Sequence, residues 1–333
     1  MDTTIHTSEA ENVVKIAPEG VGEVIPETVD LYPASAEREC KRAVRHYFRL
    51  LELYMKRYID PLVEEYKESK FRADAIADDK TPFRTRTRRS ISTMMDELEK
   101  ALDYFGMEKR LEKISKLTQT HTIREWKKAV KDAIGIDISE KYYKGGIFEK
   151  IRKAWVQENV TAIRTSLHDS VETVTKMMMD PKNESVDFIE LIDQIEKEYM
   201  KMRDLSVAMS SDQVSTLNSE LTKSIHQDAG VENYVWVSKR DELVRQSHRA
   251  FDGKIFSWSS PPDGWYVTKS KGLILTGRRC HPGEDYGCRC RAKPVFDLSL
   301  LKIPITESMN YEKQRKAQRV REVREQQGDV PVS

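Results

Sequence analysis

The stretch that decides the fold of this chain is residues 280–290, with the sequence CHPGEDYGCRC. It holds three of the four cysteines, Cys280, Cys288 and Cys290, and also His281. Thiolates and imidazoles are the ligands that zinc prefers, and a structural zinc site takes four of them in a tetrahedron. The N-terminus, MDTTIHTSEAENVVK, has neither the basic start nor the apolar core of a secretory signal, so we expect synthesis in a reducing cytoplasm. In that compartment a cysteine cluster is more often a metal site than a set of disulfides.

The spacing of these residues leaves more than one arrangement open. In the first, the Cys-x-Cys pair Cys288 and Cys290 offers two thiolates, and the His-Pro-Gly turn folds His281 back onto them. The fourth ligand is then His248, Cys280 or an acidic side chain. In the second, Cys288 and Cys290 alternate on a strand with only one of them buried, and His281 is a turn histidine with a hydrogen bond. A disulfide between the paired cysteines is disfavoured, because it closes a strained loop.

The sequence before this cluster predicts short strands. Residues 234–258 have the sequence YVWVSKRDELVRQSHRAFDGKIFSW, in which Tyr234–Val237 and Ile255–Trp258 are rich in aromatic and β-branched residues. An Asp-Gly pair just before the second strand is a turn signal. Cys290–Phe296 is a further candidate strand. These segments predict a small α+β module.

The charged connection between the first two strands carries a second candidate cluster. On a helix, Asp241, Arg245 and His248 share one face at steps of four and three residues. In one interpretation an Asp241–Arg245 pair holds a short helix and turns His248 toward the cysteines. In the other, this is a solvated charged helix, which is commoner for such a run. An enzymatic interpretation makes His248 a base or a metal ligand, but no nucleophile or paired carboxylate is placed to complete it.

The rest of the chain is predominantly helical in pattern. Apolar residues recur at steps of three and four, beginning with Cys40, Val44, Tyr47 and Leu51. The fold class that we predict is α+β, mainly α. We expect an elongated helical body followed by a small C-terminal α+β module, which a zinc ion is a candidate to stabilise. The predicted divisions are a flexible N-terminal arm (1–34), the helical body (35–230), the α+β module (231–298) and a basic C-terminal helix or tail (299–333).

The order of motifs in the module resembles the phage Mu F-like head morphogenesis family of minor capsid proteins. The resemblance covers roughly residues 150–298 and is strongest from Tyr234 to Phe296. The segment SSDQVSTLNSEL ahead of Gly230 also resembles the helix that leads into that module. The matching positions are Asp241, Arg245, His248, Asp252, Gly253, His281, Pro282, Gly283, Cys288 and Cys290.

This chain departs from the family pattern at three places. Ser210-Ser211 stand where such proteins often have an arginine, which puts one structural ion pair in doubt. Residues 263–279 form a longer insert than many relatives carry. Cys280 is not a general part of the pattern, so we rank it below His248 as a ligand.

The resemblance implies a non-enzymatic protein of the virion, located inside the capsid near the portal and in the host cytoplasm during assembly. Its implied partners are the portal protein, the major capsid or scaffolding protein and viral DNA, and its implied roles are head assembly and DNA packaging or ejection. No run of about 18 apolar residues occurs, so we expect no membrane partner.

Contact with DNA would come from local basic patches, because the net charge of the whole chain is only +1. Such patches bind phosphates without regard to base sequence, although ordinary solvated surface has the same appearance in a sequence. The candidate residues are Arg84, Arg86, Arg88 and Arg89 in one patch, and Arg278, Arg279, Arg289 and Arg291 around the cysteines.

Two other functions compete with the virion role. A metal-dependent, nuclease-like enzyme would use His248, His281 and an acidic residue on a metal with an open coordination position. Two thiolates on the metal favour a closed, structural site instead. A cytoplasmic zinc-containing regulator is the third possibility, but no helix-turn-helix or paired Cys-x-x-Cys ribbon is evident.

Overall fold

The computed structural model describes residues 23–27, 32–72, 81–134, 146–179, 188–297 and 300. Most of the predicted N-terminal arm and nearly all of the basic tail from residue 299 lie outside the described residues. The chain divides into two compact units. The first consists of residues 1–32, 119–149 and 218–333, and the second of residues 33–118 and 150–217.

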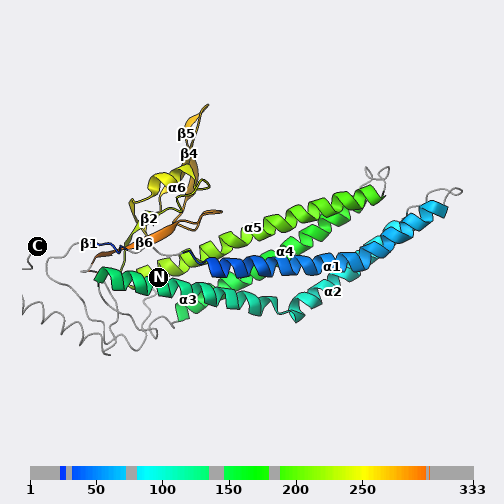
Figure 1. The fold of residues 1–333 in the computed structure, drawn as a ribbon, viewed down its shortest axis with the longest axis horizontal. Coiled ribbons are helices and arrows are strands. Elements are labelled where there is room, and N and C mark those ends of the chain that lie inside the picture. The colour runs from blue at the N-terminus through cyan, green and yellow to red at the C-terminus, as the bar shows by residue number, and fades with distance from the viewer. Residues whose placement is uncertain are drawn as a thin grey trace, which may run out of the picture. The chain divides into compact units, whose positions relative to one another are not determined.

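Five long helices and one short helix account for the helical content of the described residues. The prediction of a mainly helical chain with a small C-terminal sheet is confirmed (Figure 1). The helices are α1 (Ala34–Arg72), α2 (Thr81–Tyr104), α3 (Met107–Ile134), α4 (Gly146–Met179), α5 (Phe188–Asp228) and α6 (Gln246–Phe251).

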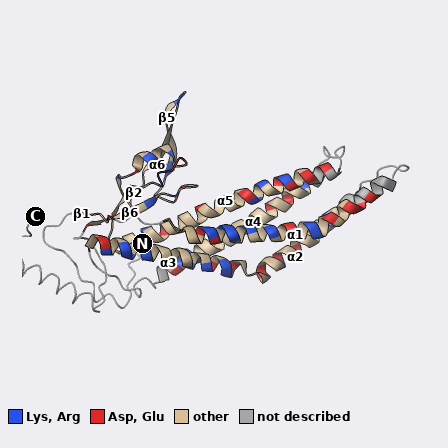
Figure 2. Ribbon diagram, in the orientation of Figure 1, with Lys and Arg blue, Asp and Glu red and all other residues tan. Residues whose placement is uncertain are grey.

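The second unit is built by packing apolar faces of α1, α2 and parts of α3, α4 and α5. Tyr47, Phe48 and Leu51 of α1 are fully buried, as the three- and four-residue steps predict. Leu98 and Leu102 of α2 are also fully buried. Along the long helices, Lys and Arg alternate with Asp and Glu (Figure 2), which suits the solvated faces of amphipathic helices.

Polar contacts fix the register of these helices. The guanidinium of Arg164 on α4 pairs with Glu99 and Asp103 on α2. The indole Nε1 of Trp155 donates to the backbone carbonyl of Gln213 on α5, at 2.8 Å. Each contact joins segments more than 50 residues apart, and periodicity alone does not predict such pairs. None of the described helices combines the length and the apolar character needed to cross a membrane.

The ends of α3 and α5 belong to the first unit, together with the sheet. Residues 119–134 and 218–228 contribute Trp126 and His226, whose rings lie 5.2 Å apart. Trp126 also packs against Phe296 of the sheet, with 5.5 Å between ring centroids. The compact unit around the sheet therefore includes helical segments that the sequence-based division assigns to the body. That division into 35–230 and 231–298 stays a prediction.

The sheet of the first unit is antiparallel and has the strand order β1-β6-β2-β3. Its strands are β1 (Glu23–Val24), β2 (Asn233–Val237), β3 (Ile255–Ser257) and β6 (Arg291–Asp297). β2, β3 and β6 lie where aromatic and β-branched residues predict strands, within one or two residues. β6 and β2 are the two inner strands, because β6 pairs with β1 and β2, and β2 pairs with β6 and β3. A separate hairpin of β4 (Asp263–Thr268) and β5 (Gly272–Arg279) forms the predicted insert.

One local expectation is wrong. The charged connection is not a helix through Asp241, because α6 begins at Gln246 and Arg245 is its N-cap residue. Asp241 instead lies in a turn, where its carboxylate accepts from the backbone N–H of Leu243 at 3.2 Å, a typical use of aspartate. Within the predicted N-terminal arm, Glu23 and Val24 pair with Asp297 and Phe296, and the flexibility of the arm stays a prediction.

The buried imidazole of His226 makes the stability of the sheet-containing unit depend on pH. Its Nδ1 accepts from the indole Nε1 of Trp258 at 3.2 Å, and burial lowers the pKa of His226 from 6.5 to about 3. The unfolded chain therefore binds a proton here that the folded chain excludes. Below pH 6.5 and down to about pH 3, stability should fall by up to about 1.4 kcal/mol per pH unit from this group.

Urea unfolding of the wild type and His226→Phe at several pH values between 4 and 7 tests this prediction. The variant should lose part of the acid sensitivity, whatever its stability at pH 7. An identical pH slope in the two proteins would contradict a role for His226.

Candidate metal centre

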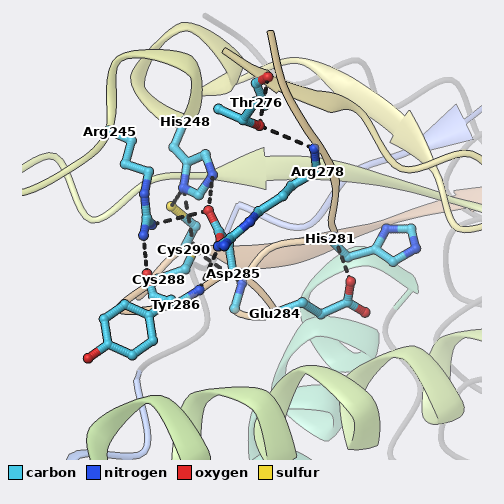
Figure 3. Close-up of polar contacts among 12 residues, drawn as sticks. Arg245, His248, Thr276, Arg278, His281, Glu284, Asp285, Tyr286, Cys288 and Cys290 are labelled. Carbon is cyan, nitrogen blue, oxygen red and sulfur yellow. Dashed lines mark hydrogen bonds and ion pairs between the residues drawn. The ribbon is translucent and has the colours of Figure 1, made fainter. Parts of the chain in front are cut away.

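Three buried side chains bring their ligand atoms together beside the sheet. His248 comes from α6, whereas Cys288 and Cys290 lie in the loop that enters β6. Nδ1 of His248 is 3.5 Å from Sγ of Cys288 and 3.8 Å from Sγ of Cys290. The ligand atoms of all three residues lie within 4.8 Å of one another (Figure 3). The side chains are 2–4% exposed, so the alternative with only one buried cysteine does not hold.

The core of the module positions these groups. The ring of Trp236 from β2 packs against His248 at 4.9 Å between centroids. The backbone N–H of Gly283 donates to Sγ of Cys288 at 3.3 Å. Gly283 has φ +89°, a conformation that favours glycine, so the His-Pro-Gly turn depends on this residue. The hydroxyl of Ser219 on α5 donates to the carbonyl of Pro282 at 2.7 Å and ties the turn to that helix.

The two neighbouring thiols differ in acidity. A hydrogen bond from Cys290 holds the pKa of Cys288 well below its usual range, and His248 acts in the same direction. The same hydrogen bond, together with burial, raises the pKa of Cys290. A thiolate at Cys288 next to an imidazole nitrogen is the donor pattern of a zinc or other soft-metal site. The residues present therefore fit a metal ion.

His281 is buried but is engaged away from this cluster. Its Nδ1 shares a hydrogen bond with the hydroxyl of Tyr234 at 2.9 Å, and its ring packs on Trp258 at 4.8 Å. Its backbone N–H donates to Oε2 of Glu284 at 2.7 Å. Burial lowers the pKa of His281, which favours the neutral ring. The structure does not bring this predicted ligand to the thiols, and the contacts of His281 match the turn-histidine alternative.

A second group of ligand atoms overlaps the first through His248 and adds Cys280 and Asp285. Oδ2 of Asp285 lies 3.8 Å from Nε2 of His248, whereas the thiols face Nδ1 on the other side of the ring. A carboxylate at Nε2 favours the tautomer that leaves Nδ1 free to bind a metal. Cys280 is buried, and burial raises the pKa of its thiol to about 12.

Comparison with known proteins connects this geometry to a family. Residues 114–293, more than half of the chain, match the family model described as "Phage Mu protein F like protein". The chain belongs to this family. The matched region contains the His248–Cys288–Cys290 cluster and the His-Pro-Gly turn, and it confirms the resemblance seen in the sequence.

One curated relative of this Mu F-like protein is an uncharacterized protein of Haemophilus influenzae (strain ATCC 51907 / DSM 11121 / KW20 / Rd). The two are 30% identical over 172 residues, which is 50% of this chain and 34% of the relative. This chain thus matches about a third of the length of that protein. No solved structure matches the chain.

Two residues that match the family pattern, Asp241 and Arg245, form ion pairs in the Mu F-like protein, but not with each other. Asp241 pairs with Arg289 at 2.7 Å and not with Arg245. Arg245 donates to the carbonyl of Tyr286 and lies 3.4 Å from Asp285. The predicted Asp241–Arg245 pair is wrong because these residues do not share a helix.

The Asp-Gly turn closes the connection between β2 and β3. Oδ1 of Asp252 accepts from the backbone N–H of Ser238 at 2.8 Å, and Oδ2 pairs with Arg240 at 2.8 Å. Gly253 has φ +78° and donates its backbone N–H to the carbonyl of Trp236 at 2.8 Å. Both residues of the pair are thus needed for the local backbone geometry.

The arginines proposed for DNA contact are in part neutralised. Around the cysteines, Arg278 lies 3.5 Å from Asp285, Arg279 lies 3.4 Å from Asp263, and Arg289 pairs with Asp241. Arg291 is half-buried in β6.

The other predicted patch lies on α2. There, Arg86 pairs with Glu65 at 2.5 Å, and Arg88 and Arg89 are exposed. The side chain of Arg84 lies outside the described residues. Paired arginines attract phosphate less than free ones, so the structure weakens the case for the patch around the cysteines.

Several site residues escaped sequence reasoning. Tyr234 and Trp258 surround His281, and Ser219 holds the turn from a helix 63 residues away. Tyr234 lies in a predicted strand. Nothing in the sequence predicts the hydrogen bond between Tyr234 and His281 or the one between Ser219 and Pro282. The position of Asp285 beside His248 also has no signal in the sequence.

Asp285→Asn should lower the affinity for zinc by about 10–100-fold, the usual cost of losing the carboxylate behind a ligating histidine. Competition with a chromophoric chelator measures this affinity. Asp263→Asn is a matched control, because Asp263 pairs with Arg279 on the hairpin and is in neither ligand group. Equal affinities for Asp285→Asn and the wild type would show that Asp285 does not orient His248.

Proposed function

We propose that this Mu F-like protein is a minor head protein of a tailed phage, associated with the portal inside the capsid. There it assists head assembly and DNA packaging or ejection. The single observation that carries the proposal is the family match over residues 114–293, because this is a head morphogenesis family. The proposed partners are the portal protein, the major capsid or scaffolding protein and viral DNA, with the host cytoplasm as the place of assembly.

We further propose that the ion held by His248, Cys288 and Cys290 is zinc and that it has a structural role. When bound, zinc would crosslink α6 to the loop before β6. Asp285 would orient His248 from the Nε2 side of the ring, and Cys280, which belongs to the second ligand group with Asp285, stays an alternative ligand. Ligand burial and two thiolates are typical of closed structural sites, whereas catalytic zinc keeps a position open to substrate.

The same observations argue against a nuclease-like enzyme. That alternative places His248 and His281 on one metal, but Nδ1 of His281 is hydrogen-bonded to Tyr234 and His281 belongs to neither ligand group. A protein whose only role is in head assembly does not need a metal site that a substrate can reach.

Purified heads test the virion role. The full chain should co-purify with intact heads and with the portal ring released from them, at a constant ratio to the portal protein. Absence from washed heads would overturn the proposal. Incubation of the purified protein with linear DNA and added divalent metals should give no cleavage. Cleavage that is lost in His248→Ala would favour the enzyme instead.

A further inference from the structure

The β4–β5 hairpin presents apolar side chains to solvent. Val267, Leu273 and Leu275 are 50%, 63% and 64% exposed. The register pairs Val267 with Leu273 and Trp265 with Leu275, so these side chains lie on one face of the ribbon. Only Trp265 on this face packs against the core of the module. We call the three exposed residues the hairpin patch.

The hairpin also has an unpaired edge. Among the described strands, β4 and β5 pair with each other and with no third strand. On the β4 side, the backbone N–H of Val267 donates to Oε1 of Gln246 at 2.7 Å. β5 is eight residues long and almost wholly exposed, and Figure 1 shows the hairpin extending beyond α6. A long apolar edge strand is ready to pair with another chain unless charge or a covering element prevents it.

The charge of the hairpin indicates which kind of surface it would bind. The hairpin, residues 263–279, contains Lys269, Lys271, Arg278 and Arg279, and its one carboxylate, Asp263, lies 3.4 Å from Arg279. Within the described part of the chain, neither lysine at the tip forms an ion pair. A patch of apolar residues rimmed by cations is complementary to an apolar surface rimmed by carboxylates.

We propose that the hairpin patch docks on an acidic, partly apolar surface of another head protein, and that an extended segment of this partner pairs with the free edge of β5. The proposal rests on the head-protein function proposed above. Main-chain hydrogen bonds to β5 supply affinity, and the alternate side chains Leu273 and Leu275 supply specificity.

Two other occupants fit the hairpin less well. A second copy of this chain would place the two lysines at the tip against two identical lysines, which opposes edge pairing. DNA would engage the lysines, but phosphates and sugars offer little to three exposed aliphatic side chains.

Heads assembled with full-length variants test the proposal. The first variant combines Leu273→Ser with Leu275→Ser, and the second combines Lys269→Glu with Lys271→Glu. Leu243→Ser is the matched control, because Leu243 is 82% exposed but lies in the loop before α6. Copies per portal ring are counted by quantitative mass spectrometry. Far-ultraviolet circular dichroism and the melting temperature of each purified variant confirm that it is folded.

We expect incorporation of both hairpin variants to fall by about tenfold or more, with the control at the wild-type level. Equal incorporation of wild type and hairpin variants would overturn the docking proposal alone. Absence of the wild type from heads would overturn the head-protein function and the docking proposal with it.

Two solution measurements distinguish the other occupants. Loss of binding to short duplex DNA in the lysine variant, with normal incorporation into heads, would assign the hairpin to nucleic acid. A wild-type dimer in sedimentation velocity that becomes monomeric in the leucine variant would assign it to a second copy. Either result would overturn the proposal.

Discussion

Purified wild-type protein should contain about one zinc ion per chain, and Cys288→Ser should contain almost none. Cys288 is 3% exposed, and its Sγ lies 3.5 Å from Nδ1 of His248. A serine at this position would leave the ion with one ligand too few, and burial would keep water from replacing it. An ion present at 1,000 times its dissociation constant adds about 4 kcal/mol to the free energy of unfolding. The variant should lose this contribution, and its melting temperature should fall accordingly.

Elemental analysis and chelator-dependent unfolding measure this effect. A chelator should destabilise the wild type but should not change Cys288→Ser further, because the same ion cannot be removed twice. Cys40→Ser is the matched control, since Cys40 is a buried cysteine of the other compact unit and should not affect zinc content. A wild type without metal, whose unfolding does not respond to chelator, would disprove the zinc proposal and leave the thiols as part of the core.

Trp236→Ala should lower the free energy of unfolding of the sheet-containing unit by about 3–5 kcal/mol, the usual cost of truncating a large core side chain to alanine. Trp236 is fully buried on β2, and its ring packs on Phe251 at 5.1 Å and on His248 at 4.9 Å. The cavity would also remove a wall of the metal centre, so the affinity for zinc should fall as well.

Denaturant unfolding of Trp236→Ala and of the milder Trp236→Phe measures this loss. Leu243→Ala is the control and should change stability by less than about 0.5 kcal/mol, because Leu243 is 82% exposed. If Trp236→Ala were as stable as this control, β2 would not be at the centre of the core. If it unfolds completely, Trp236→Phe should still show an intermediate loss of stability and of zinc affinity.

The sequence by itself determined the local character of most elements. The three- and four-residue steps along α1 predicted the buried side chains Tyr47 and Leu51, since an amphipathic helix buries one stripe. The aromatic and β-branched residues around Trp236 predicted β2, and the Asp-Gly pair predicted the turn that Gly253 makes at φ +78°. The order of motifs from Tyr234 to Phe296 was also enough to indicate the family. Each of these properties depends on residues that are neighbours in the chain.

Only the tertiary structure decided which histidine faces the thiols. His281 is closer to Cys288 in sequence, yet the hydroxyl of Tyr234 holds its Nδ1, and His248, 40 residues upstream, takes the place beside Sγ. The carboxylate of Asp285 on the other side of that ring is likewise a product of the fold. Such choices depend on how strands and turns distant in sequence pack, and spacing along the chain carries no information about that competition.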